Sequence, residues 1–319
     1  MTGGGDGAAG LSGIEASVDD LIGLRFRAQR LELGIARRAR HSMVGAHGSP
    51  FRGRGMEFAE SRIYQPGDDV RSIDWRVTAR TGRPHTKLFQ EERERPVILL
   101  VDLGASMFFG TRTAYKSVLA AETAALIAWA ATHGGDRVGA LVAGRSHHLE
   151  LKPVSGRRGV LRVLRALAAV SRQASDDQEQ QIKLCDSLLR ARHVARPGSL
   201  LVVISDFYDL DQEAAGHLSR MRQHNDMLAC WIHDRLEIEP PPPGRYEVSD
   251  GWQTATLDTL SSRARARYAA SFGARIEALR GTLGRLAIPL LPIATGDDVA
   301  EALRRGASAQ TLGKARLTR

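Results

Sequence analysis

Two aspartates stand directly after short apolar runs, at positions from which a side chain can hold a metal ion. Asp102 follows the run 97–101, and Ser106 comes four residues later. Asp206 follows a second such run, 200–205. Carboxylate and hydroxyl oxygens are the hard ligands that Mg²⁺ prefers in proteins. If the two runs are neighbouring strands, their ends present a cluster of oxygen ligands suited to a divalent cation.

Aspartates and serines after a strand also have a structural role, because they commonly cap the N-terminus of a helix. We predict that role for Asp211, and we favour a binding site for Asp102 and Ser106 because they alternate beside a buried strand. An Mg²⁺-dependent phosphohydrolase with Asp102 as its nucleophile is an alternative hypothesis. Two observations speak against it: Gly104 stands where a second aspartate would follow, and no lysine is evidently placed to hold a phosphate.

The elements that must position these residues alternate between short apolar runs and helical patterns. This alternation predicts an α/β fold with a doubly wound, mostly parallel sheet, one antiparallel edge strand, and helices on both faces. In such folds, ligands bind beyond the carboxyl ends of the strands. The predicted strands are 97–101, 137–143, 148–151, 200–205, 227–233 and 289–293, the predicted helices are 114–133, 157–173, 177–195, 211–223, 258–284 and 296–305, and a hairpin is predicted over 246–256.

The formal charge of +9 is concentrated at the two ends of the 319-residue chain. Residues 21–55 hold eight arginines and one glutamate, and residues 304–319 hold five basic residues and no acidic one. We predict disorder over 1–17, a basic amphipathic helix over 18–44 and a basic tail over 306–319. Basic ends can bind nucleic acid or an anionic surface through phosphates, which is a further alternative. We favour a solvated helix face, because no aromatic residues interleave with the arginines, so nucleic-acid binding is not expected and membrane contact is at most peripheral.

Composition and cysteine usage narrow the class of protein. No apolar stretch approaches the ~18 residues of a membrane span, and no leader-like segment begins the chain. Cys185 and Cys230 are far apart in apolar surroundings and fit neither a zinc knuckle nor a disulfide framework. A reducing, cytoplasmic location is therefore expected.

A strand that ends in D-x-S-x-S, with a second aspartate after a later strand, resembles the metal-ion-dependent adhesion site of von Willebrand factor A domains. The resemblance implies an Mg²⁺ ion held by Asp102, Ser106 and Asp206, with Ser155 in place of the family's threonine. Gly104 departs from the family pattern, because it stands where the first serine should be and removes one hydroxyl ligand. The implied site is therefore degenerate.

The segment before the first predicted strand is more distinctive. It contains the block R-x-Y-x-P-G-D-D-x-R-x-I-D-W from Arg62 to Trp75. This block closely resembles the signature of a bacterial family called domain of unknown function 58, whose members join it to a degenerate von Willebrand factor A domain. The resemblance covers about residues 45–305. Family members commonly occur beside MoxR-type AAA+ ATPases, which implies a chaperone-like or assembly role.

The signature block also has a physical interpretation of its own. We predict that 45–96 is a β/loop segment packed on a main domain that spans 97–305. Its acidic and basic residues are close enough in sequence to form a paired charge network, with aromatic and apolar residues as anchors. The alternative is a partner-binding surface, because Trp and Arg are typical of interaction hot spots. The residues concerned are Arg62, Tyr64, Asp68, Asp69, Arg71, Asp74, Trp75 and Arg80.

Together these observations favour a non-enzymatic protein-binding module. The resemblance implies an adaptor or co-chaperone that works with a MoxR-type AAA+ ATPase and an unidentified client protein. An Mg²⁺ ion at the degenerate site would bridge this chain to a carboxylate of its partner.

Overall fold

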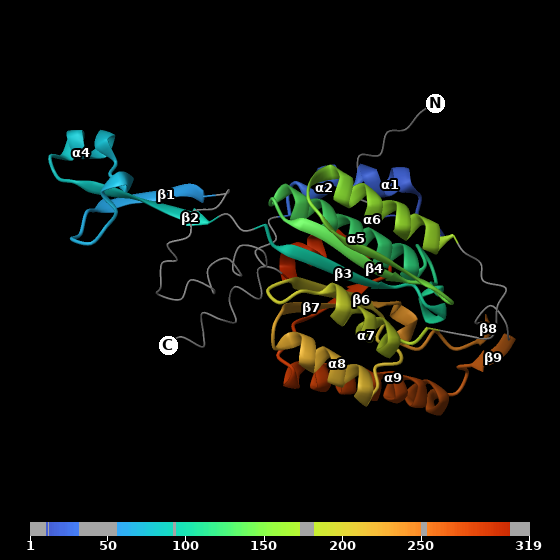
Figure 1. Cartoon of the computed structure of the whole chain (residues 1–319). Coiled ribbons are helices and arrows are strands. Elements are labelled where there is room, and N and C mark those ends of the chain that lie inside the picture. Colours follow the sequence, from blue (N-terminus) through green and yellow to red (C-terminus); the bar gives the residue numbers. More distant parts are fainter. Residues whose placement is uncertain are drawn as a thin grey trace. The chain divides into compact units, whose positions relative to one another are not determined.

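The computed structural model describes residue 11 and residues 13–31, 56–91, 94–172, 182–249 and 254–306. The chain divides into two compact units, both of which are visible in Figure 1. Residues 1–39 and 95–319 form the sheet unit, and residues 40–94 form the signature unit. The expected packing of the signature segment on the main domain stays a prediction. None of the helices that the structure describes is long and apolar enough to cross a membrane.

The sheet unit is built on six strands in the spatial order β10-β7-β6-β3-β4-β5. Five of them run parallel, and the edge strand β5 runs antiparallel to β4. The predicted α/β fold with one antiparallel edge strand is therefore confirmed. The strands are β3 (Pro96–Asp102), β4 (Arg137–Ala143), β5 (His148–Val154), β6 (Leu200–Ser205), β7 (Asp226–His233) and β10 (Leu290–Ala294).

Helices cover both faces of this sheet, as Figure 1 shows. One face is packed with α1 (Val18–Gly23), α2 (Arg25–Ala28), α5 and α6, and the other with α7, α8 and α9. Residues 299–306 are also helical, and a separate hairpin joins β8 (Arg245–Ser249) to β9 (Thr254–Asp258). The helices of the two faces are α5 (Lys116–His133), α6 (Gly156–Ser171), α7 (Leu184–Val194), α8 (Gln212–Arg222) and α9 (Ser262–Arg285).

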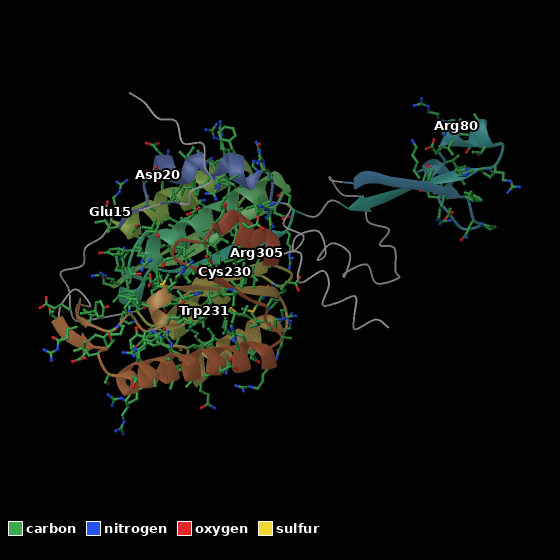
Figure 2. All side chains as sticks on the ribbon, turned by 180° about the vertical axis from the view of Figure 1, so that it is seen from behind. Glu15, Asp20, Arg80, Cys230, Trp231 and Arg305 are labelled. Atoms are coloured by element: carbon green, nitrogen blue, oxygen red, sulfur yellow. The ribbon has the colours of Figure 1, made fainter. Side chains whose placement is uncertain are left out.

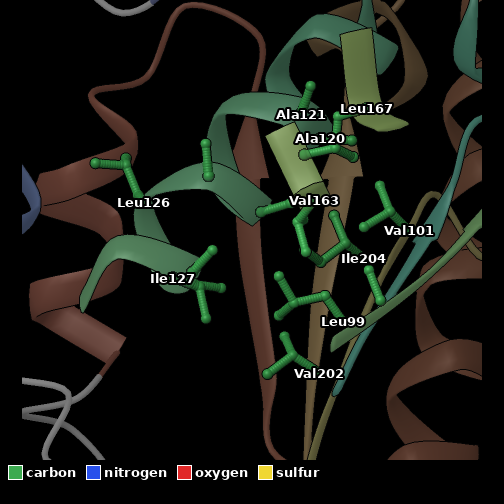
Figure 3. Packing of buried hydrophobic residues seen from close by; sticks show 14 of the residues in the cluster. Leu99, Val101, Ala120, Ala121, Leu126, Ile127, Val163, Leu167, Val202 and Ile204 are labelled. Carbon is green, nitrogen blue, oxygen red and sulfur yellow. The ribbon is translucent and has the colours of Figure 1, made fainter. Parts of the chain in front are cut away.

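The central strand β3 shows why its sequence is a continuous apolar run. Successive side chains of a strand point to opposite faces, so a strand covered on both faces needs apolar residues at every position. Leu99 and Val101 belong to the cluster under α5 and α6, which Figure 3 shows from close by. Ile98 and Leu100 belong to the cluster under α7 and α8. All four side chains are fully buried.

The N-terminal helix expected over 18–44 is broken into two short helices within the described residues, α1 (Val18–Gly23) and α2 (Arg25–Ala28). Its predicted apolar face is buried as far as Leu31. The indole N–H of Trp129 in α5 donates a hydrogen bond to the Leu21 carbonyl at 3.1 Å. The rest of the predicted helix lies outside the described residues, as does the tail after residue 306.

The prediction of disorder is wrong for residues 13–17. The Gly13 N–H donates to the Thr113 carbonyl at 3.0 Å, and the Gly13 carbonyl accepts from the Tyr115 N–H at 3.1 Å. Ser17 caps α1 through the Asp20 N–H. A composition rich in Gly and Ala hid these backbone contacts. Residues 1–10 and 12 lie outside the described residues.

The signature unit is a two-stranded antiparallel sheet with two short helical segments in its connection. The strands β1 (Met56–Ile63) and β2 (His85–Glu91) pair with an irregularity between Phe58 and Glu60. The connection holds η1 (Val70–Ser72) and α4 (Trp75–Thr81), and α4 ends at Gly82, whose φ of 69° is left-handed. The sequence did not predict α4, because seven residues are too few to show helical periodicity.

Candidate functional site at the carboxyl rim of the sheet

The order of the strands places the predicted site residues at one edge of the sheet, which we call the carboxyl rim. It consists of the segments that follow the carboxyl ends of β3, β4, β6 and β7. The strand order reverses between β3 and β6, and Val101 pairs with Ile204 there. Asp102 is the last residue of β3 and Asp206 follows the last residue of β6, so both stand at adjacent strand ends. Such a reversal point is where doubly wound folds bind ligands.

Asp102 is a half-buried residue whose two carboxyl oxygens both accept hydrogen bonds within the protein. Its Oδ1 accepts the Gly104 N–H at 2.9 Å, and its Oδ2 accepts the Ser205 hydroxyl at 2.7 Å. Burial, followed by the negative charge of Asp206, raises the pKa of Asp102 to about 7.

A buried ammonium group faces the second aspartate. Lys116 begins α5, and its side chain is 1% exposed. Its Nζ donates to Asp206 Oδ2 at 2.7 Å and to Glu237 Oε1 at 2.7 Å. The other oxygen of Asp206 accepts the Tyr208 N–H at 2.9 Å. Burial alone lowers the pKa of Lys116, but the two carboxylates raise it above its usual value, so the ammonium stays charged.

The residues that follow β7 hold Glu237 in position beside Lys116. Glu237 lies in η3 (Arg235–Glu237), which follows β7, and its Oε2 accepts the Asp234 N–H at 2.9 Å. Asp234 in turn accepts the hydroxyl of Thr111 at 2.9 Å and that of Thr295 at 2.6 Å. The loop between β3 and α5 is thereby tied to the ends of β7 and β10. The position of Lys116 at the start of α5 is fixed by this network.

The remaining predicted ligands divide between the two edges of the sheet. Ser106 lies in η2 (Ala105–Met107), at the carboxyl rim directly after Asp102. The expectation that Ser155 joins it is wrong. Because β5 is antiparallel, its last residue Val154 pairs with Val138 at the start of β4, whereas Asp102 pairs with Ala143 at the end of β4. Ser155 is the N-terminal residue before α6, at the opposite edge.

These side chains do not fit the Mg²⁺ site that the resemblance implies. The cation that meets Asp206 is the Lys116 ammonium at 2.7 Å, and a divalent ion on the same oxygen would meet its positive charge. Gly104 offers no hydroxyl, and a Cβ added there would lie 3.1 Å from Asp102 Oδ1. Mg²⁺ needs about six oxygen ligands in near-octahedral geometry. Among the described residues, the rim therefore has the Lys116 ammonium on Asp206 and not a set of six oxygen ligands.

Two aromatic side chains stack with arginines on the outer surface of the carboxyl rim. The guanidinium of Arg275 lies 4.0 Å from the ring centroid of Tyr208, which is 63% exposed. That of Arg145 lies 4.2 Å from the ring of Phe108. Phe207, between Asp206 and Tyr208, has a left-handed φ of 53°, a strained conformation for a bulky residue. This backbone turn buries Phe207 and leaves Tyr208 exposed.

The cavity beneath this surface is small. It measures about 10 Å³, which is room for roughly one water molecule. Asp206, Glu237 and Arg275 line it, together with Trp231, which Figure 2 labels in the sheet unit. A small-molecule site usually needs some hundreds of Å³.

Within the described part of the chain, the signature residues form a capped turn that includes one of the expected ion pairs. Arg62 pairs with Asp68 at 2.7 Å, as expected for the network. Asp69 caps η1 through the Arg71 N–H, and Asp74 caps α4 through the N–H groups of residues 76 and 77. The Ser61 hydroxyl donates to Asp74 at 2.9 Å. These contacts fix the loop locally.

The expected anchors of the signature unit behave differently from one another. Trp75 is 70% exposed, so it is not an anchor within its unit, whereas Tyr64 is half-buried. The Tyr64 N–H donates to the Pro84 carbonyl at 2.9 Å. Arg71 and Arg80 are exposed, and Figure 2 labels Arg80 in this unit.

Sequence reasoning missed Lys116, and α5 contains the feature that points to it. This helix is buried on all sides, yet it carries Lys116 and Glu122. A charge in such a helix must have a partner. Glu122 has its partner in Arg27 at 3.0 Å, and Lys116 has Asp206 and Glu237. Lys116 pairs with two carboxylates of the protein itself, so the expectation that no lysine is evidently placed to hold a phosphate stays a prediction.

The strand order and the antiparallel edge strand define a doubly wound α/β domain. Residues 60–277 match the family described as "Protein of unknown function DUF58", and the chain belongs to that family. It is 31% identical over 292 residues to the uncharacterized proteins Rv1480 of Mycobacterium tuberculosis and Mb1516 of Mycobacterium bovis, with 89% of each chain covered.

Solved structures with detectable similarity include two bacterial proteins. One is BatB from Bacteroides thetaiotaomicron, with 13% identity, a TM-score of 0.41, and coverage of 68% of this chain and 98% of that one. The other is a von Willebrand factor type A protein from Catenulispora acidiphila, with 11% identity, a TM-score of 0.36, and coverage of 70% and 44%.

Proposed function

We propose that this chain is a non-catalytic protein-interaction module and that its carboxyl rim is the contact surface. The observation that carries the proposal is the exposed Tyr208, stacked on Arg275 beside the reversal point of the sheet. Tyr and Arg are the residue types that most often dominate protein–protein binding energy. The network beneath them fixes the backbone, so the surface is prepared before a partner arrives.

The geometry favours binding over catalysis. A hydrolase needs room for its substrate, and the cavity that Asp206, Glu237 and Arg275 line holds about one water molecule. A phosphohydrolase would also need a free carboxylate nucleophile. Asp102 instead has a pKa raised to about 7 by burial and by Asp206, and both of its oxygens accept hydrogen bonds.

The partner we propose is a MoxR-type AAA+ ATPase, for which this chain would act as an adaptor or co-chaperone toward a client protein. Membership of the family supports this choice, because the resemblance of the signature block implies such a neighbour. A cytoplasmic location follows from the same proposal, and cell fractionation tests it.

The test is a direct binding measurement between the full chain and the MoxR-type ATPase of the same organism. Arg275→Ala and Tyr208→Ala are each expected to weaken binding by about tenfold or more. Arg280→Ala is the matched control, since Arg280 is an exposed arginine further along α9. Binding that both rim variants leave unchanged would contradict the proposed surface.

The enzymatic alternative has its own test. A phosphatase screen of the wild-type chain and Asp102→Asn is expected to show no turnover that depends on Asp102. Robust turnover in the wild type that this substitution abolishes would overturn the proposal of a non-catalytic module.

A further inference from the structure

We propose that the Lys116 ammonium is a built-in replacement for the divalent cation of this fold, so that the carboxyl rim works without metal. The inference deepens the proposed function, on which its consequence for partner binding rests. It assigns a role to a residue that neither the motif nor the family description names.

The position of Lys116 is the first argument. Its Nζ bonds two carboxylates that follow two different strands, Asp206 after β6 and Glu237 after β7. It enters from the start of α5, below the loop that leaves β3. The ammonium thus lies beyond the ends of β6 and β7, on Asp206, one of the side chains through which the resemblance implies Mg²⁺.

The burial of the group is the second argument. The side chains of Lys116 and Asp206 are each 1% exposed, and that of Glu237 is 14% exposed. A charge taken so far from water must be compensated in place. Two carboxylates around one ammonium provide that compensation, and they use the ammonium's N–H donors at hydrogen-bond distance. A displaced Lys116 would leave both carboxylates without a cation.

Lys116 also supplies the positive charge that the acidic strand ends require. Strand ends that gather carboxylates repel one another until a cation neutralises them. A divalent ion neutralises the carboxylates with a charge of +2 and binds their oxygen atoms directly, whereas the Lys116 ammonium neutralises them with a charge of +1. The smaller charge suits this rim, because Gly104 has no side chain to bind an ion and each oxygen of Asp102 already accepts a hydrogen bond.

The burial of the Lys116 ammonium decides which part of the rim a partner can contact. A bound metal with an open coordination position can take a carboxylate from a partner protein, but an ammonium that is 1% exposed has no such access. A partner must therefore contact the outer surface of the rim, where Arg275 and Arg145 stack on aromatic rings. Binding should not depend on Mg²⁺.

The experiment titrates Mn²⁺, as a probe for divalent ions, into the full-length chain and follows binding by calorimetry and thermal unfolding. The wild-type chain is expected to bind no Mn²⁺ at the rim and to unfold at the same temperature in Mn²⁺ and in EDTA. Lys116→Ser, which removes the ammonium and supplies a hydroxyl, is expected to gain one Mn²⁺ and a rise in unfolding temperature with the ion. Lys152→Ser, at an exposed lysine of β5, is the matched control and should match the wild type.

Each result of this experiment either supports or contradicts the replacement of the metal ion by Lys116. Wild-type binding of Mn²⁺ that Asp206→Asn or Asp102→Asn abolishes would overturn the inference, as would a folded Lys116→Ser that gains no binding. If Lys116→Ser does not fold alone, its refolding yield with and without Mn²⁺ is compared, and a yield that the ion does not increase counts against the inference. None of these measurements uses the ATPase, so a failure of the proposed function would appear separately, as absent partner binding in EDTA.

Discussion

The sheet unit and the signature unit treat charge and apolar surface in opposite ways. In the sheet unit, charged side chains such as Lys116, Asp206 and Glu122 are 2% exposed or less. In the signature unit, apolar side chains lie in the open: Trp75 is 70% exposed, and Val70 is 60% exposed. A large unit with a two-sided core can bury a charge if it pairs it. A small one cannot cover all its apolar residues.

This difference indicates which kind of contact stabilises each unit. The rim of the sheet unit is held by ion pairs whose partners are far apart in sequence, 90 and 121 residues for Lys116. The loop of the signature unit is held by local caps, such as Asp74 on α4. Removing a charge should therefore be costly in the first unit and mild in the second.

The largest effect is expected from Lys116→Met, which leaves Asp206 and Glu237 buried without their cation. We expect a loss of about 3–5 kcal/mol in the free energy of unfolding, measured with urea. Lys152→Met, at an exposed lysine, should change it by less than about 0.5 kcal/mol. Equal losses in the two variants would remove the distinction between buried and exposed charge.

A smaller and opposite effect is expected from Asp102→Asn. The pKa of Asp102 in the folded chain, about 7, lies above its ordinary value of 3.8. Between these two values the folded chain holds a proton that the unfolded chain has lost, so this group's contribution to stability falls as the pH rises. Above about pH 7 the native carboxylate is charged at a cost that Asn avoids.

Asp102→Asn should therefore stabilise the chain by about 2 kcal/mol near pH 8, and the gain should shrink toward pH 4. Thermal unfolding over this pH range measures the effect. A gain that stays constant with pH, or a loss at pH 8, would show that Asp102 is not a raised-pKa group.

A local effect is expected in the signature unit from Asp74→Ala. This change removes the cap that accepts the N–H groups of residues 76 and 77. Amide hydrogen exchange in α4 should become roughly fivefold faster or more, while exchange in α5 stays the same. Faster exchange in both helices would mean that the cap supports more than its own unit.

The smallest effect on stability is expected from Trp75→Ala, because most of this side chain is in solvent. The free energy of unfolding should change by about 0.5 kcal/mol or less. The matched variant is Trp129→Ala, at a tryptophan that is 5% exposed, which should cost about 3–5 kcal/mol. A large loss from Trp75→Ala would show that the exposed patch is structural.

The sequence predicted the strands that are buried on both faces, because such strands are continuous apolar runs. The predicted runs 137–143 and 200–205 coincide with β4 and β6. Ser155 was misplaced because it was taken from the family resemblance, whereas the antiparallel direction of β5 puts it at the opposite end of the strands. Gly13 was misjudged because backbone hydrogen bonds do not depend on side-chain type. Periodicity could not show α4, which has seven residues.

The site was predictable in its acids but not in its cation. Asp102 and Asp206 were found because each follows a buried run. Lys116 was missed because its partners come from β6 and η3, which the sequence does not bring together. A lysine inside a helix with no polar face was the available indication, and it requires the assumption that every buried charge is paired.

The most direct test of the account follows the side-chain ammonium of Lys116 by nitrogen NMR in the full-length chain, with Lys116→Arg to assign the resonance. The account predicts a charged, slowly exchanging ammonium at neutral pH whose resonance is the same in Mg²⁺ and in EDTA. A Lys116 resonance that shifts or is lost as Mg²⁺ binds would contradict it, because the rim would then hold a metal ion in place of the lysine.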